Sequence, residues 1–167
     1  MSFLLKYSMG KKLKIGLFSF TADEGCMIVL LEILNYKFFE WKDKIDIRFS
    51  RLFKSSKDFS DLDVAFVEGT ISTPREEEKV KAIRANAKRV VAVGTCAING
   101  SPTNLRNSFN EDKMQEIGHV LEKFDLYPKI KSVKEVIPVD KEVPGCPMIE
   151  NGFVKVMEEY MKEFGVS

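Results

Sequence analysis

Short apolar segments alternate with helix-patterned segments along this chain, and this alternation restricts the possible folds more than any other feature of the sequence. Several short segments are apolar, or alternate apolar with polar residues, which is typical of β-strands. They are Lys12–Phe20, Asp46–Phe53, Asp63–Glu68 and Arg89–Val93. We also predict a short edge strand over Val133–Val139, because this segment is rich in β-branched residues.

Helical patterns separate most of these strands. Met27–Trp41 carries apolar residues at spacings of three and four, as one face of an amphipathic helix requires. Thr73 and Pro74 predict the start of a second helix, with Thr73 as its N-cap and an end near Ala87. Further segments are predicted as a loop over Asn99–Asn110 and as helices over Asp112–Phe124 and Ile149–Phe164.

The order of these elements predicts an α/β fold. Strands that alternate with helices favour a flavodoxin-like, doubly wound and mainly parallel sheet with helices on both faces. We expect one such domain over residues 12–167 and a flexible N-terminal tail over residues 1–11. In folds of this class, ligands bind outside the carboxyl ends of the strands.

Charge and composition exclude several classes of function. The 26 Lys and Arg residues nearly balance the 25 Asp and Glu residues, so no net field favours nucleic acid. No apolar stretch reaches the roughly 20 residues that a membrane span needs, and the N-terminus is a poor signal peptide; we therefore expect a cytoplasmic protein. His119 is the single histidine, which argues against His-rich zinc sites and Ser-His-Asp catalysis.

Three cysteines follow strand-like segments and form the most informative pattern for function. Cys26 lies just past the first strand, Cys96 just past the fourth, and Cys146 in a Pro-Gly-Cys-Pro turn after the last extended segment. Such positions can all reach the same edge of a parallel sheet. Three thiolates near one point suit a soft metal centre, either an iron–sulfur cluster or zinc with one added carboxylate.

Asp23 is the candidate for a fourth ligand. It precedes Cys26 by the spacing of a C-x-x-C pair, so one loop would supply an oxygen and a sulfur. An N-cap role for Asp23 explains its position equally well. Gly25, Gly94 and Gly145 would let the backbone approach an inorganic centre closely. The alternative for each cysteine is simple packing in the core.

Four motifs together resemble the small subunit of nickel–iron hydrogenases, in the broad family that includes the complex I subunit with the terminal cluster. The loop Asp23–Cys26 stands where that family has Cys-x-Gly-Cys or Cys-Glu-Gly-Cys, and Asp63–Ile71 is similar to its DVA-V-EG-I strand. Val91–Gly100 and Val143–Met148 are similar to its segments with a central cysteine and with Pro-Gly-Cys-Pro. The cytoplasmic, coenzyme F420-linked and sulfhydrogenase types resemble the chain in particular.

This resemblance implies a proximal [4Fe–4S] cluster and an electron-transfer role, with no independent catalytic site on this chain. The ligands carried over are Cys26, Cys96 and Cys146, and the fourth position falls on Asp23. Aspartate at the fourth position leaves three alternatives for this chain: an aspartate-ligated [4Fe–4S] cluster, a [3Fe–4S] cluster, or a degenerate subunit. The resemblance also implies that Glu68 lies near the cluster. The complete set of expected neighbours of the ligands is Glu24, Gly25, Glu68, Gly94, Thr95 and Gly145.

The same resemblance implies partners. A nickel–iron hydrogenase-like large subunit would carry the active site, and a flavoprotein or ferredoxin-type subunit would take electrons onward, because three cysteines suffice for one cluster only. Candidates for the apolar partner surface, each with core packing as its alternative, are Phe18, Phe20, Met27 and Phe109.

Three other functions stay open at this point. The chain could be a complex I-like iron–sulfur subunit without nickel chemistry, or a structural subunit without a cluster. It could also be a flavodoxin-like domain that binds flavin or nucleotide. Asp23 and Glu24 argue against the last, because their charges would repel a phosphate in the first loop.

Overall fold

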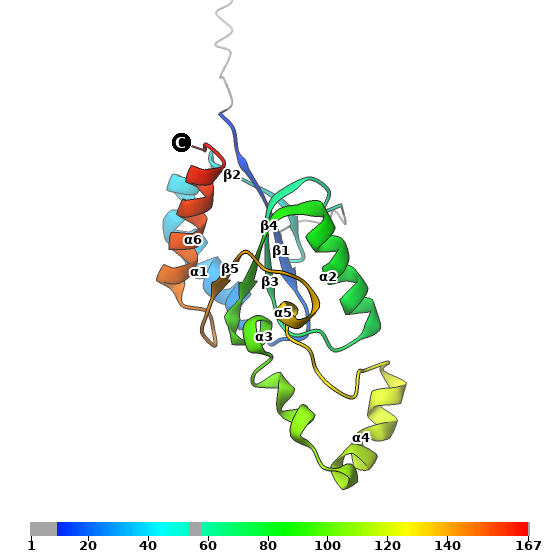
Figure 1. Ribbon diagram of the computed structural model, residues 1–167. Coiled ribbons are helices and arrows are strands. Elements are labelled where there is room, and N and C mark those ends of the chain that lie inside the picture. Colours follow the sequence, from blue (N-terminus) through cyan, green and yellow to red (C-terminus); the bar gives the residue numbers. More distant parts are fainter. Residues whose placement is uncertain (1–9, 54–57, 167) are drawn as a thin grey trace, which may run out of the picture.

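The computed structural model describes residues 10–53 and 58–166, which form a five-stranded sheet covered by helices on both faces (Figure 1). The strands are all parallel, in the order β2-β1-β3-β4-β5. This confirms the predicted flavodoxin-like, doubly wound class. The strands are β1 (Leu13–Ser19), β2 (Ile45–Ser50), β3 (Leu62–Glu68), β4 (Ala87–Val93) and β5 (Lys141–Val143).

The helices connect these strands in the alternating pattern that the sequence predicts. Thr73 caps α2 as expected, since its Oγ1 accepts a hydrogen bond from the backbone N–H of Glu76 at 3.1 Å. The helices are α1 (Gly25–Trp41), α2 (Pro74–Asn86), α3 (Gly94–Asn99), α4 (Glu111–Lys123), α5 (Val133–Val136) and α6 (Glu150–Glu163), with a 3-10 helix at Thr103–Ser108.

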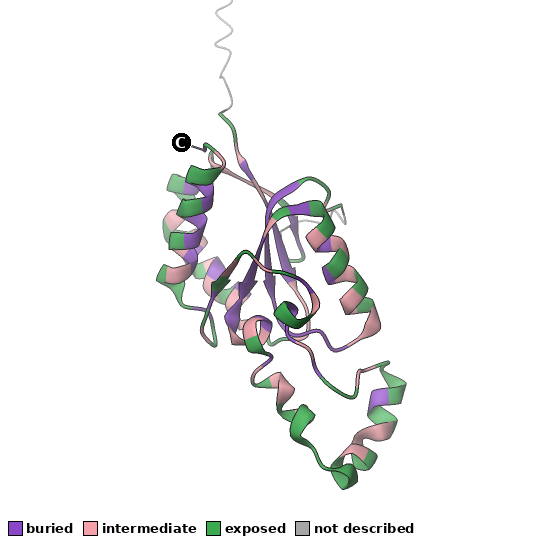
Figure 2. Ribbon diagram, viewed as in Figure 1, coloured by how far each residue is buried: buried purple, intermediate pink, exposed green. Residues whose placement is uncertain are grey.

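Two hydrophobic cores lie on opposite faces of the sheet. On one face, α1 and α6 pack against Ile15, Leu17 and Phe66. On the other, α2, α3 and α5 pack against Phe18 and Val67. Figure 2 shows the consequence: the central strands are buried, and the outer surfaces of the helices are exposed. Burial on both faces explains why residues 64–67 of β3 form a continuous apolar run rather than an alternating one.

The region between β4 and α6 departs from the sequence prediction. The predicted edge strand at Val133–Val139 is wrong: Val133–Val136 is the helix α5, and the edge strand is β5. Ser132 and Glu135 explain the helix, because they form a reciprocal capping box at its start. The segment directly after β4 forms the short helix α3, and the predicted loop 99–110 contains a 3-10 helix.

The segment that contains α4 projects from the body of the domain beyond α3 (Figure 1). In α4 itself only Leu121 is buried. Asn110 caps the helix by accepting a hydrogen bond from the Lys113 backbone N–H at 3.1 Å. Local capping therefore stabilises a helix that contributes little to either core.

Of the predicted tail, residues 1–9 lie outside the described residues, and residues 10 and 11 are exposed. Among the helices that the structure describes, none combines the length and the apolar character needed to cross a membrane.

Candidate metal centre

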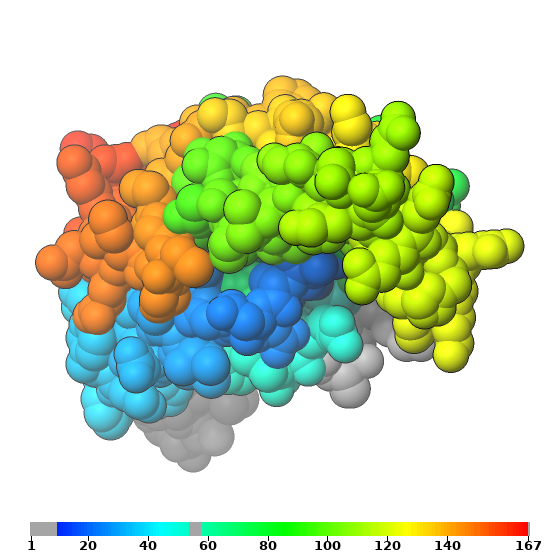
Figure 3. Space-filling model, turned by 90° about the horizontal axis from the view of Figure 1, so that it is seen from below, coloured from blue at the N-terminus to red at the C-terminus, as the bar shows by residue number. Residues whose placement is uncertain are grey.

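The three cysteine-bearing turns meet at the carboxyl edge of the sheet. Figure 3 views this edge from below: the blue segment after β1, the green segment of α3 and the orange segment after β5 lie against one another. The pairing of Val93 with Val143 brings the ends of β4 and β5 to one level. Cys26 and Cys96 are partly buried there, while Cys146 is exposed.

Gly94 is the residue around which the three turns pack. A Cβ atom at Gly94 would lie 2.6 Å from the Cys26 sulfur, and its φ of 78° disfavours side chains in any case. The backbone N–H of the next residue, Thr95, donates to the Gly145 carbonyl at 2.8 Å. Glycine at position 94 thus lets the loop of Cys26, the start of α3 and the turn of Cys146 come into direct contact.

The first loop has a compact shape set by Asp23 and Glu24. The Asp23 carboxylate accepts a hydrogen bond from the Gly25 backbone N–H at 2.9 Å. Glu24, with a φ of 60°, occupies the N-cap position of α1 without a side-chain cap. Asp23 is therefore a turn-forming residue and not the N-cap. One of its carboxylate oxygens is engaged in the turn.

The same loop lies against the Cys146 turn. A Cβ atom at Gly25 would be 3.6 Å from the Cβ of Pro147. Gly145 has a φ of 118°, and a side chain there would meet the Pro147 carbonyl at 2.5 Å. The Cys146 turn therefore requires glycine at position 145, whereas the approach of Gly25 to Pro147 is an ordinary van der Waals contact.

Glu68 is buried directly behind Cys26. It is 1% exposed, and its Oε1 accepts a hydrogen bond from the Ser19 hydroxyl at 3.0 Å. Its Oε2 has no hydrogen-bond partner among the described residues, although the Cys26 thiol and the Met27 backbone N–H lie nearby. Burial raises the pKa of Glu68 above its ordinary value, and the Ser19 hydrogen bond opposes this effect.

The surroundings favour protonated thiols in the absence of a cation. Burial, followed by the charge of Glu68, raises the pKa of Cys26 to about 12. Burial also raises the pKa of Cys96, with smaller contributions from the charges of Cys146 and Asp23. A metal ion would have to displace these protons, as thiolate ligation requires. Its positive charge would relieve the repulsion among the acids and thiolates.

The donor set fits an iron–sulfur cluster in its chemistry. Within the ranges that the structure describes, no three Cys, His, Asp or Glu side chains form a group that could hold a single metal ion. A cluster does not need such a group, because its ligands attach to separate iron atoms at the corners of an inorganic core. The backbone of Gly94 and Gly145 can approach such a core without side-chain obstruction.

The structure thus brings together most of the residues that the sequence singles out. Cys26, Cys96, Glu68 and the glycines line one region, Cys146 borders it, and Asp23 lies at its rim. Ser19 is a further residue of this region that no motif of the sequence indicates, and it pairs with Glu68 in the register of β1 and β3. Two of the candidates for the partner surface, Phe18 and Met27, are buried in the cores, so core packing, the alternative given for each, holds for both.

Comparisons with known proteins find related sequences along most of this chain. The family described as "NADH ubiquinone oxidoreductase, 20 Kd subunit" matches residues 24–160. A subunit of the F420-non-reducing hydrogenase of Methanothermobacter thermautotrophicus is 31% identical over 155 residues, which cover 83% of this chain and 50% of the relative. Sulfhydrogenase 2 subunit delta of Pyrococcus furiosus is 29% identical over 150 residues, covering 90% and 62%. The chain thus spans about half to three fifths of the length of these curated relatives.

Solved structures share the fold. A chain of a NAD⁺-reducing [NiFe]-hydrogenase in the H2-reduced state superposes with a TM-score of 0.77 at 23% identity, covering 92% of this chain and 93% of that one. A chain of the Ni-Fe-Se hydrogenase from Desulfomicrobium baculatum gives a TM-score of 0.66 at 20% identity, covering 89% and 61%.

Proposed function

The chain belongs to the family of the NADH ubiquinone oxidoreductase 20 kDa subunit, and on that premise we propose that it is an electron-transfer subunit of a hydrogenase-type oxidoreductase. Relatives named as subunits of F420-non-reducing hydrogenase and sulfhydrogenase support this assignment. The observation that carries the proposal is the meeting of the three cysteine turns around Gly94.

The proposed cofactor is one [4Fe–4S] cluster held by Cys26, Cys96, Cys146 and Asp23. A bound cluster would supply one-electron transfer, and the chain's own residues would hold it and set its surroundings. The Ser19–Glu68 pair would place a buried acid behind Cys26. Backbone N–H groups of the glycine-containing turns would be available as donors to sulfide.

A three-cysteine [3Fe–4S] cluster is the second candidate. The hydrogen bond between Asp23 and the Gly25 N–H favours it, because it gives Asp23 a structural role that needs no iron. In that case the first loop would contribute Cys26 alone.

The proposed partner is a nickel–iron hydrogenase-like large subunit. It would dock over the part of the sheet edge that carries Cys26, Cys96 and Cys146, called the cysteine edge below. Exposed apolar side chains follow each cysteine turn: Ile28 is 56% exposed, Leu105 67% and Ile149 56%. Phe109, predicted for this surface, is 38% exposed. A rim of this kind suits an obligate interface, which is more hydrophobic than ordinary surface. A further flavoprotein or ferredoxin-type subunit and a cytoplasmic location complete the proposal.

Anaerobic purification with the partner subunit tests the proposal. We expect a brown protein with iron and acid-labile sulfide, and a reducible signal in electron paramagnetic resonance. Cys96→Ser should lose most of the iron, because one ligand is removed while the size of the side chain is kept. Ser108→Ala, an exposed change in the segment that follows, should retain it.

Three outcomes contradict parts of the proposal in different ways. A colourless, iron-free complex would support the cluster-free structural subunit instead. Iron content unchanged by Cys96→Ser would refute the ligand assignment. A large subunit without bound nickel would point to the complex I-like alternative.

A further inference from the structure

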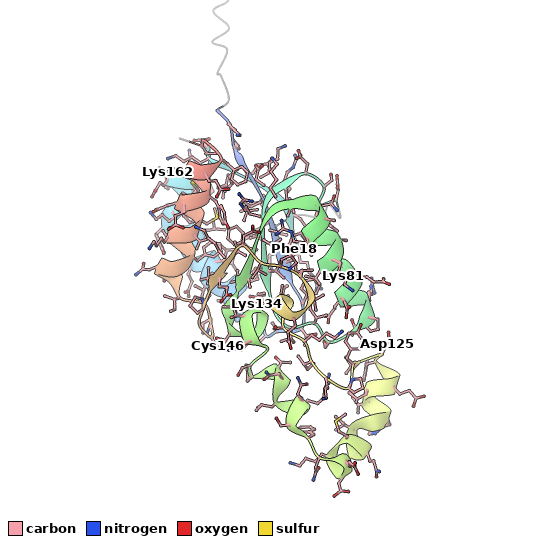
Figure 4. The ribbon with its side chains drawn as sticks, viewed as in Figure 1. Phe18, Lys81, Asp125, Lys134, Cys146 and Lys162 are labelled. Carbon is pink, nitrogen blue, oxygen red and sulfur yellow. The ribbon has the colours of Figure 1, made fainter. Side chains whose placement is uncertain are left out.

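A second hollow lies at the end of β1, on the α2 side of the sheet. It has a volume of about 880 Å³, within the range typical of small-molecule sites. Its walls come from the end of β1, the end of β2, the first turns of α2 and the segment after α4. Figure 4 marks Asp125, one of its rim residues, and Lys81, which lies on α2 outside the hollow.

Three cations line this hollow without an ion-pair partner among the described residues. Arg51, Arg75 and Lys79 make no salt bridge with any carboxylate in the part of the chain that the structure describes. Burial lowers the pKa of Lys79, and repulsion from the two arginines lowers it further. An anion bound among these groups would relieve that repulsion.

Two carboxylates, Glu76 and Asp125, also line the hollow and offset only part of the charge of its three cations. The Glu76 carboxylate accepts hydrogen bonds from the Ser72 N–H at 2.8 Å and the Thr21 hydroxyl at 3.1 Å. These hydrogen bonds hold the Glu76 carboxylate against the loop before α2. Asp125 is an exposed residue at the rim. The cations remain in excess.

Aromatic rings form the apolar part of the lining: Phe20, Phe49, Phe59 and Phe124. The Lys79 ammonium lies 5.7 Å from the ring centre of Phe20 and 5.5 Å from that of Phe49. Phe49 also stacks on Phe18, which fixes it to the core. Phe124 is 61% exposed, and the Lys123 ammonium lies 5.6 Å from the centre of its ring. Planar aromatic ligands pack well on such rings.

We propose that this hollow binds a ligand of the mononucleotide class, in which a phosphate meets Arg51, Arg75 and Lys79 and a planar ring packs on the phenylalanine side chains. The hollow combines an excess of cations with four aromatic side chains, of which Phe124 is exposed, and so offers contacts to both the phosphate and the ring of such a ligand. This site differs from the first loop, where Asp23 and Glu24 disfavour phosphate. The proposal does not depend on the presence of a cluster.

Calorimetric titration of the full chain tests the proposal. The probes are UMP, AMP and flavin mononucleotide, whose rings differ in size. Inorganic phosphate and adenosine are titrated separately, because they represent the phosphate part and the nucleoside part of the ligand. We expect one nucleotide per chain, bound at least about tenfold more tightly than either half alone. Lys79→Met and Arg75→Met should each weaken binding by about tenfold or more, because each removes a charge-assisted contact.

Lys81→Met is the matched control, since it removes the same charge from the same helix outside the hollow. It should leave binding unchanged, as should Cys96→Ser, which separates this proposal from the assignment of the cluster. Circular dichroism melting of each variant verifies that it folds. The proposal is overturned if no nucleotide binds more tightly than inorganic phosphate, or if Lys81→Met weakens binding as much as Lys79→Met.

Discussion

Two regions at the end of β1 differ in charge and in construction. The cysteine edge carries thiols and carboxylates, and its shape comes from backbone turns at Gly94 and Gly145. The hollow beside α2 carries arginine and lysine, and its shape comes from side chains that reach in from separate elements. Ser19 belongs to both, because it lines the hollow and donates to Glu68.

This difference separates two ways in which one sheet edge can build a site. Turns that depend on glycine tolerate no side chain, so the cysteine edge should respond sharply to small changes in the backbone. The α2 side, where long side chains carry the charge, should instead respond to acid and salt. The following experiments test that distinction.

The largest effect is expected for Gly94→Ala. The added methyl group meets the Cys26 sulfur, and the residue must keep a positive φ, which together should cost about 1–3 kcal/mol in the free energy of unfolding. Denaturant unfolding measures this change, and iron content should fall with it. Gly118→Ala is the control, because a Cβ there meets nothing within 4 Å on α4, so it should be neutral or stabilising. Equal effects of the two substitutions would contradict the backbone account of the cysteine edge.

An intermediate effect is expected at Asp23, where two variants separate the turn from ligation. Asp23→Ala removes the acceptor of the Gly25 N–H and should cost about 1 kcal/mol in unfolding free energy. Asp23→Asn keeps an acceptor oxygen and should unfold like the parent chain. If Asp23 binds iron, the asparagine variant should nevertheless change the paramagnetic resonance signal. Both variants are measured by denaturant unfolding and by paramagnetic resonance.

Asp23→Cys then tests the ligand directly. A thiolate donates more electron density than a carboxylate, so the variant should keep a cluster and lower its reduction potential. A redox titration monitored by paramagnetic resonance gives the potential. An unchanged spectrum and potential in both the Asn and the Cys variants would leave Asp23 with its turn role alone.

The smallest effect is expected for Glu77→Gln, on α2. Hydrogen bonds from Lys131, Lys81 and Tyr127 lower the pKa of Glu77 to about 2. A lowered pKa in the folded state stabilises the protein above the ordinary value of 4.5, and this contribution is lost as pH falls towards 2. The variant should therefore have a slightly lower melting temperature than the parent chain at pH 7, and the difference between the two melting temperatures should shrink below pH 4.5. A difference that persists at pH 2 or in high salt would argue against this electrostatic account.

The sequence pattern predicts most of the sheet and its class, because local periodicity identifies the buried strands and amphipathic helices. The prediction for Val133–Val139 is wrong because it weights β-branched residues above the Ser132–Glu135 capping box, which decides the local structure. The true edge strand, β5, has only three residues and is defined by its pairing with β4 rather than by its own composition.

The candidate sites also divide into features that a local pattern predicts and features that depend on contacts between distant segments. The cysteines, with their glycines, stand out in the sequence because each follows a strand-like segment. The surroundings of Lys79 and the pairing of Ser19 with Glu68 depend on contacts between distant segments, so no local pattern predicts them. Phe18 and Met27 show a related limit of sequence patterns. Apolar residues beside a site look alike in the sequence whether they face a partner or, as these two do, the core.

The contact of Thr95 with Gly145 also has a consequence for biosynthesis. Cys26 and Cys96 are synthesised well before Cys146, whose turn follows the short strand β5 and contacts the start of α3 through the hydrogen bond from the Thr95 N–H to the Gly145 carbonyl. The complete set of proposed ligands therefore exists only after the chain has been synthesised beyond Cys146.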